Sequence, residues 1–195
     1  MLLLDVPYSE KDEAKALGAK WNPELKKWYI FEPKKYFKFK KWIGSVYGEN
    51  ADDNLIICNH LYVATSEIRC FKCGNKTTVI GFGIDDYVYI TYGEYTYKPF
   101  YDYSERDIHF AGNIEGVPKY INDIFLEKYH NIFNKKTKSI DNFQNYCQHC
   151  GVLLNDWYIF KKVSASFYIT SIEQLENINI TKINLDFDFI AYADI

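Results

Sequence analysis

The sequence predicts an α+β protein with a small N-terminal β-α-β-β-like module and a larger second domain that contains an α/β insert. A strand–helix–strand pattern occupies residues 2–43, and two matched Cys-x-x-Cys-Gly loops lie at 70–74 and 147–151. A chain of 195 residues, 48% hydrophobic, is long enough for one large domain or two small ones. We therefore expect one domain at 1–48 and a second at 49–195, with its insert at 75–146.

The N-terminal module is expected to begin with a strand and a helix. Apolar residues alternate over residues 2–6, as they do in a half-buried strand. Ser9 is a suitable helix N-cap, and the acidic residues that follow it favour the positive end of a helix. Gly18 suits the position just after a helix, where a positive φ is common. These signals predict a helix between Ser9 and Gly18.

A second strand and a basic aromatic segment complete this module. Pro23 and Glu24 mark a turn, and residues 27–30 have a strand pattern, so that Trp21 and Trp28 are expected to face each other or the helix. The segment from Lys34 to Trp42 is expected to be helical. Its apolar residues are predicted to share one face: Tyr36, Phe37, Phe39, Trp42 and Ile43.

The run from Leu4 to Asn22, closed by Lys27–Ile30, contains a recognisable set of residues. They are Val6, Pro7, Lys11, Ala14, Lys15, Leu17, Gly18, Ala19, Trp21, Lys27, Trp28 and Tyr29. With this pattern, residues 2–43 resemble a small bacterial domain of unknown function that occurs alone or appended to plasmid primase-like and other mobile-element proteins. The resemblance implies a DNA-processing context, and it implies no catalytic residue.

Charge is distributed unevenly along the chain. Residues 1–48 carry ten Lys and six acidic residues, a net charge of +4, whereas the whole chain carries −3, which leaves −7 for the remainder. Lysines can contact phosphates and tryptophans can stack on unpaired bases. The candidates for nucleic-acid binding are Lys20, Trp21, Lys26, Lys27, Lys34, Lys35, Lys38, Lys40, Lys41 and Trp42. The alternative is a solvated lysine surface over core tryptophans, with Trp28 a stronger core candidate than Trp42.

The two cysteine loops predict a structural metal site. Two residues between the thiols let one tight turn present both sulfurs to one ion, and the following glycine tolerates the positive φ that closes the turn. We expect Cys70, Cys73, Cys147 and Cys150 to hold Zn²⁺. Four thiolates close the coordination sphere, so that the ion cannot activate water. His149 is the alternative ligand within the second loop.

The loops and their flanks resemble those of bacterial zinc-ribbon proteins with a long insert, so the second domain is expected to be zinc-ribbon-based. In a zinc ribbon each loop is the turn of a β-hairpin, which implies strands at 77–80 and around 153–160. Within the insert, strand-forming residues predict a strand at 87–92, and apolar residues along one side predict a helix at 115–133. A short helix from Ser171 through Glu176 and a final strand at 183–192 follow.

Other residues with chemical potential have simpler interpretations. Cys58 and His60 suggest either a metal pair or a reactive thiol, but their apolar flanks favour a buried cysteine in a strand. An acidic cluster with His109, formed by Asp102, Glu105 and Asp107, reads as a surface loop rather than a metal site. The Gly81-Phe82-Gly83 segment lacks the residues of a phosphate-binding loop.

These observations predict a non-enzymatic, zinc-containing bacterial binding protein that associates with single-stranded nucleic acid through its basic module. The alternative is a protein-interaction protein, such as an immunity protein or a mobile-element adaptor, whose acidic, Tyr-rich body docks onto a basic partner. No run is long and apolar enough for a signal peptide or a membrane span. We therefore expect a cytoplasmic protein with no membrane contact and no small-molecule substrate.

Overall fold

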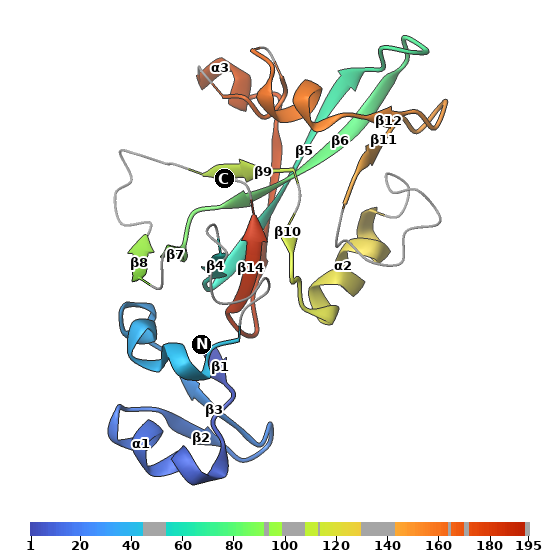
Figure 1. Ribbon diagram of the computed structural model, residues 1–195. Helices are drawn as coiled ribbons and strands as arrows, with labels where there is room; N and C mark the ends of the chain where they lie inside the picture. Colours follow the sequence, from blue (N-terminus) through green and yellow to red (C-terminus); the bar gives the residue numbers. More distant parts are fainter. Residues whose placement is uncertain are drawn as a thin grey trace. The chain divides into compact units, whose positions relative to one another are not determined.

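The structure is a computed structural model. It describes residues 1–44, 54–91, 94–98, 108–112, 114–129, 143–163, 165–169 and 172–193. The chain divides into two compact units: Met1–His60, Asp85–Asp107 and Asn184–Tyr192 form unit 1, and Leu61–Ile84, Ile108–Ile183 and Ala193–Ile195 form unit 2. Helices combine with mostly antiparallel sheets (Figure 1), so the predicted α+β class is confirmed. The predicted boundary between residues 48 and 49 lies outside the described residues.

Unit 1 begins with the predicted β-α-β-β module. Strand β1 (Leu2–Leu4) and strand β2 (Lys20–Asn22) both pair antiparallel with strand β3 (Lys27–Ile30), in the order β1-β3-β2. Trp21 lies opposite Trp28 in this sheet, and their ring centroids are 5.6 Å apart, as predicted.

The helix of this module begins later than predicted. Ser9 lies inside the 3-10 helix η1 (Tyr8–Glu10), and α1 (Lys11–Ala16) follows without any side-chain cap. Pro7 starts the 3-10 turn, which closes when the Glu10 N–H donates to the Pro7 carbonyl at 2.9 Å, so Ser9 is not the N-cap. The predicted end is confirmed, because Gly18 has a φ of +102°.

The basic aromatic segment is a 3-10 helix, η2 (Pro33–Trp42), which changes the predicted face. Its ends show bonds three residues apart: the Lys35 N–H donates to the Glu32 carbonyl at 2.8 Å, and the Ile43 N–H donates to the Lys40 carbonyl at 3.3 Å. Three residues per turn align positions i and i+3. The buried residues are therefore Tyr36, Phe39 and Trp42, whereas Phe37, predicted on the same face, is 50% exposed.

A second sheet of unit 1 contains strands from distant parts of the chain. Its strands β14 (Phe189–Ala193), β4 (Asn54–Ile57), β7 (Tyr87–Thr91) and β8 (Glu94–Lys98) are neighbours in that order, all antiparallel. Ile56, Cys58 and Val88 join the buried cluster that contains Leu4 and Tyr36. The core of the N-terminal module therefore continues into this sheet.

Unit 2 is built around a four-stranded sheet. Strands β13 (Asn179–Asn184), β5 (His60–Arg69), β6 (Lys76–Ile84) and β9 (His109–Ala111) are neighbours in that order. Its remaining elements are β10 (Ile114–Glu115), α2 (Lys119–Tyr129), β11 (Asn145–Tyr146), β12 (Leu153–Leu154), the π-helical turn η3 (Trp157–Lys161) and α3 (Ile172–Leu175). The ring of Phe82 on β6 lies 5.1 Å from Phe125 of α2 and 5.6 Å from Phe143, which places aromatic packing at the centre of this unit.

Two predicted strands differ from the structure. The strand expected around 153–160 ends at Leu154, and the chain turns into η3, where the Lys162 N–H donates to the Trp157 carbonyl at 2.8 Å. The segment predicted as one final strand is divided between β13 and β14. Asp188 lies between these strands, is 4% exposed and accepts a hydrogen bond from the Tyr36 hydroxyl. The apolar alternation in this segment does not reveal that inward-facing carboxylate.

Within the described part of the chain, every helix is too short or too polar to cross a membrane.

Candidate functional site

The two cysteine loops have the same backbone design. In each loop the first Cys carbonyl accepts the N–H of the closing glycine at 2.9 Å, Gly74 in the first loop and Gly151 in the second. Both glycines have positive φ, +71° and +67°, as the sequence predicts. The first loop is the turn of the β5–β6 hairpin and the second is the turn of the β11–β12 hairpin, which is the predicted arrangement.

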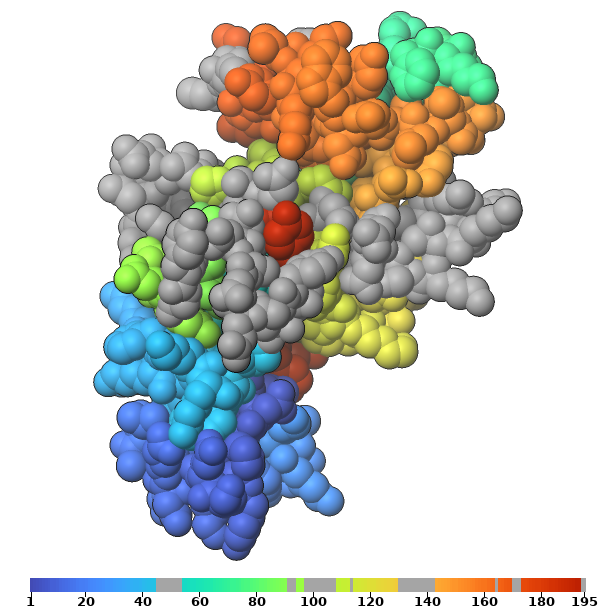
Figure 2. Space-filling view, in the orientation of Figure 1, coloured from blue at the N-terminus to red at the C-terminus, as the bar shows by residue number. Residues whose placement is uncertain are grey.

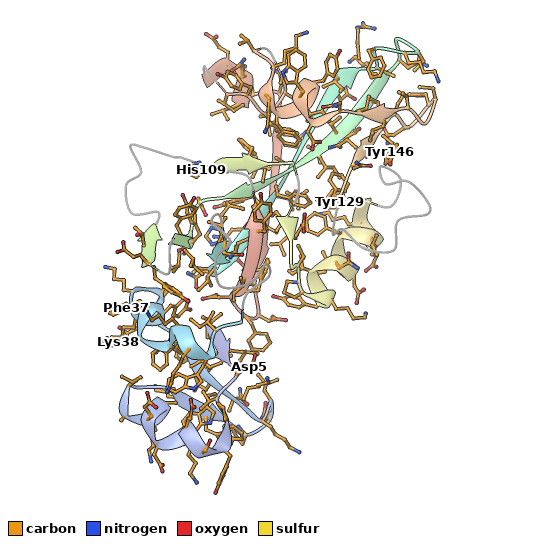
Figure 3. The ribbon with its side chains drawn as sticks, viewed as in Figure 1. Asp5, Phe37, Lys38, His109, Tyr129 and Tyr146 are labelled. Carbon is orange, nitrogen blue, oxygen red and sulfur yellow. The ribbon has the colours of Figure 1, made fainter. Side chains whose placement is uncertain are left out.

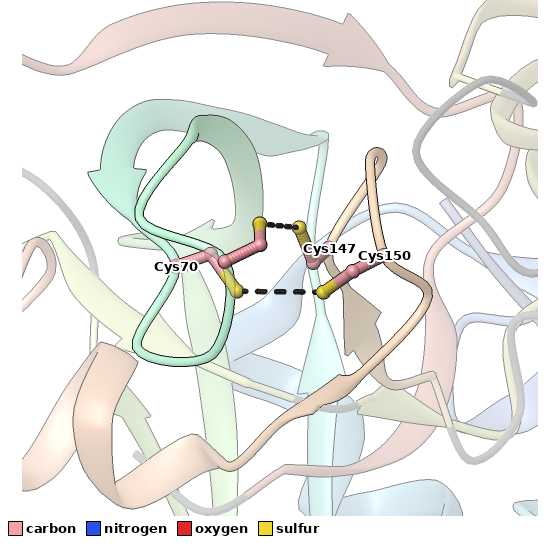
Figure 4. A group of neighbouring side chains, drawn as sticks. Cys70, Cys147 and Cys150 are labelled. Atoms are coloured by element: carbon pink, nitrogen blue, oxygen red, sulfur yellow. Dashed lines mark hydrogen bonds between the residues drawn. The ribbon is translucent and has the colours of Figure 1, made fainter.

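The four sulfurs of these loops gather at one point in unit 2 (Figure 4). The Sγ atoms of Cys70 and Cys150 are 3.7 Å apart, as are those of Cys73 and Cys147, and all four lie within 4.8 Å of one another. A tetrahedral site with metal–sulfur bonds of about 2.3 Å, typical of zinc, has sulfurs about 3.8 Å apart. The five cysteines of the chain are all free thiols, so the cluster is not a pair of disulfides. The predicted ligands therefore form one possible metal site.

The local electrostatics act in opposite directions on the two cysteines of the second loop. Burial opposes the charge on Cys147, but hydrogen bonds from the Cys150 and His149 backbone outweigh it and lower the pKa of Cys147 to about 6. At Cys150 the Val152 backbone favours ionisation, but burial and the neighbouring thiols raise its pKa to about 11. Close thiols compete for charge in this way until a cation neutralises them, so the cluster is suited to a metal that replaces protons.

Side chains inside the second loop fasten it to strand β6. The Gln148 amide oxygen accepts the Thr78 N–H at 3.0 Å, and the Gln148 N–H donates to the Thr77 hydroxyl at 3.1 Å. His149 Nε2 lies 2.8 Å from the Lys76 carbonyl, to which a protonated Nε2 donates. The imidazole is thus engaged with the backbone, whereas all four cysteine sulfurs converge.

Asn145 makes a further connection that sequence reasoning missed. Its side chain is fully buried, and its amide oxygen accepts the Ile80 N–H at 2.7 Å while its amide nitrogen donates to the Ile80 carbonyl at 2.9 Å. The Asn145 amide therefore satisfies the backbone N–H and carbonyl of Ile80, as the backbone of a neighbouring strand would. An asparagine at the start of a cysteine loop is too common a residue for sequence alone to reveal this role.

Cys58 is a buried thiol in unit 1, as expected for a cysteine between strands. Its side chain donates to the Ile56 carbonyl at 3.4 Å, and burial, together with the carboxylates of Asp188 and Asp86, raises its pKa. His60 Nε2 is 2.8 Å from Asp85. A neutral thiol is a poor nucleophile, so the structure gives Cys58 no activation. The acidic residues Asp102, Glu105 and Asp107, interpreted as a surface loop, lie outside the described residues, and His109 is on β9.

The basic candidates of the N-terminal module fall into two groups. Lys27 pairs with Asp5, Lys35 with Glu32 at 2.5 Å, and Lys41 with Glu13 at 2.6 Å. Five further candidates have exposed side chains: Lys20, Lys26, Lys34, Lys38 and Lys40. The first group is therefore partly neutralised inside the module.

The tryptophan candidates are placed differently from the prediction. Trp42 is 3% exposed, its indole N–H donates to Glu10 at 2.5 Å, and it is more buried than Trp28. A buried ring cannot stack on a base unless the core opens, so the prediction for Trp42 is corrected. Trp21 is 48% exposed. Phe37, next to Lys38 on η2 (Figure 3), is also exposed, although an α-helical period predicts it on the buried face.

The N-terminal module is the part of the chain that a family model matches. Residues 1–44 match a domain of unknown function, DUF5710, in agreement with the resemblance carried by residues 2–43. The DNA primase TraC of Escherichia coli is 46% identical over 39 residues, which are 20% of this chain and 3% of that primase. The chain thus spans a small fraction of that relative. No solved structure matches the chain.

Proposed function

We propose that the chain is a non-enzymatic, zinc-containing binding protein that contacts single-stranded nucleic acid through its N-terminal module. The observation that carries the proposal is the outer surface of η2. With three residues per turn, the residues that flank the buried face form two outward rows. Neighbouring residues within one row are about 6 Å apart along the helix axis. One row reads Lys34, Phe37 and Lys40, and the other reads Lys35, Lys38 and Lys41.

These rows have the composition that single strands require. Lys34, Lys38 and Lys40 are exposed, and Phe37 exposes half of its surface between two of them. Lysines supply phosphate contacts and an exposed ring supplies a stacking platform for a base. The match to a segment of a DNA primase supports the same context for this module.

The structural support for zinc is the sulfur geometry. Four thiolates at tetrahedral spacing are typical of zinc and of iron, and they leave no coordination position for water. We propose zinc because Cys-x-x-Cys loops in pairs are its usual structural ligands. The ion would connect two hairpins and stabilise unit 2 without chemistry of its own. Elemental analysis of the purified protein is expected to give one zinc per chain, and its loss after Cys147→Ser would support the ligand assignment.

The nucleic-acid proposal is tested by reversing the charge of the outer rows. A variant with Lys34→Glu, Lys38→Glu and Lys40→Glu should bind labelled oligothymidine at least about tenfold more weakly at low salt. The salt slope of its affinity should fall by about 2, at about 0.7 for each lost phosphate contact. The measurement is fluorescence anisotropy across a salt series.

A matched control carries the same charge change elsewhere. Lys119→Glu, Lys128→Glu and Lys182→Glu alter three exposed lysines of unit 2 and should retain the affinity. Equal losses in both variants would mean that net charge alone matters. Failure of the wild-type protein to bind any oligonucleotide, with recovery of a basic protein partner instead, would favour the alternative protein-interaction function.

A further inference from the structure

An exposed aromatic cluster of unit 2 lies at the first cysteine loop, where green and orange surfaces meet in Figure 2. Phe71, between Cys70 and Cys73, is 62% exposed, and its ring stacks on Tyr158 with centroids 5.8 Å apart and planes 22° from parallel. Trp157, 51% exposed, meets Tyr158 edge to face at 5.1 Å. We call Phe71, Trp157 and Tyr158 the aromatic cluster. It brings three solvent-facing rings together from two distant segments.

The rings are held by the packing of η3 onto the sheet of unit 2. Ile159 is fully buried, and Phe160 stacks on Phe167 at 5.1 Å. Phe160 lies against two glycines: a Cβ on Gly81 or on Gly112 would be 2.9 Å or 2.8 Å from its ring. The close approach of Phe160 therefore requires glycine at both positions. Trp157 and Tyr158, which precede Ile159, remain exposed.

Cations flank the aromatic cluster along the sequence, although the chain as a whole is acidic. The segment 69–76 contains three cations, Arg69, Lys72 and Lys76, and no acidic residue, and residues 161 and 162 are lysines. The Lys162 ammonium lies 5.8 Å from the Tyr158 ring centroid. Glu67 pairs with Lys76 at 3.2 Å, so this pair adds no net charge, and the cations that remain beside the rings are Arg69, Lys72 and Lys162.

We infer that the aromatic cluster is a second binding surface, specific for single-stranded nucleic acid. Exposed rings accept unpaired bases by stacking, and the flanking cations neutralise the phosphates between them. A duplex keeps its bases stacked internally, so it engages the cations but not the rings. This surface belongs to unit 2 and does not depend on binding by the N-terminal module.

The experiment uses the 195-residue, zinc-loaded chain with Lys34→Glu, Lys38→Glu and Lys40→Glu, so that the outer rows of η2 no longer contribute to binding. In this background Tyr158→Ala and Trp157→Ala should each weaken oligothymidine binding by about tenfold, the typical effect of one lost base stack. Tyr158→Phe keeps the ring and should retain the affinity. Tyr168→Ala truncates another exposed tyrosine of unit 2 and should also retain it.

The outcomes separate this surface from the N-terminal one. Loss with the alanine variants and retention with Tyr158→Phe supports the aromatic cluster, even if the lysine reversals by themselves change nothing. Unchanged affinity in both alanine variants, equal binding of duplex and single strand, or no binding by the wild-type chain overturns it. Concentration-dependent self-association that the same alanine variants abolish, without oligonucleotide binding, also overturns it and identifies a protein contact.

Discussion

Asn145 illustrates how one side chain connects the second cysteine loop to the sheet of unit 2. Both polar ends of its amide bond to the backbone of Ile80, and the side chain is fully buried. Asn145→Ala leaves a buried N–H and a buried carbonyl without this partner. Each unsatisfied group costs about 1–3 kcal/mol, so a clear drop in the free energy of unfolding by urea is expected.

The control for Asn145 is an asparagine on the surface of the same unit. Asn177 is exposed, and Asn177→Ala should change the unfolding free energy by no more than about 0.5 kcal/mol. Equal effects of the two substitutions would contradict the role assigned to Asn145.

Cysteine reactivity distinguishes the two kinds of thiol in this chain. Cys58 is fully buried, and its raised pKa keeps it protonated at neutral pH, whereas the other four cysteines are the proposed zinc ligands. With zinc bound, iodoacetamide should label none of the five cysteines. After chelation it should label four, and denaturant should expose the fifth. Mass spectrometry counts the labels, and early labelling of Cys58 would contradict its burial.

At the scale of elements, η2 determines which residues of the basic segment face solvent. A three-residue repeat places Phe39 in the core, fully buried, and leaves Phe37 half exposed. Phe39→Ala should destabilise unit 1 by about 3–5 kcal/mol, whereas Phe37→Ala should stay within about 0.5 kcal/mol. Thermal unfolding of the two variants makes the comparison. Similar losses for both would mean that the segment has an α-helical face instead.

Some elements of the fold could be predicted from the sequence and others could not. The cysteine loops were predictable because the spacing of two thiols and a glycine leaves few backbone solutions, and the β1–β3 module because turn residues separate short alternating runs. The period of η2 was not, because apolar residues at 36, 37, 39 and 42 fit either helix type. Asp188 was not predicted to be buried, because its partners Tyr36 and Asn59 are distant in sequence.

At the scale of the whole molecule, the four clustered cysteines and the N-terminal module belong to different units. All four clustered thiols lie in unit 2, which has its own buried cluster around Val79, Leu154 and Ile159. The core of unit 1 contains none of these cysteines. Structural zinc contributes folding free energy to the segments that it connects. Loss of zinc is therefore expected to act on unit 2 more strongly than on unit 1.

Hydrogen exchange resolves this difference strand by strand. After chelation, amides of β5, β6, β11 and β12 should lose protection, because the ion that closes both hairpins has gone and the thiolates at its position repel one another. Amides of β1 and β3 should keep their protection, since their partners lie within the N-terminal sheet. Cys70→Ser should reproduce the pattern without chelator. Uniform loss across both units would show that the metal stabilises the chain as one cooperative body, and unchanged protection everywhere would show that the four sulfurs hold no structural ion.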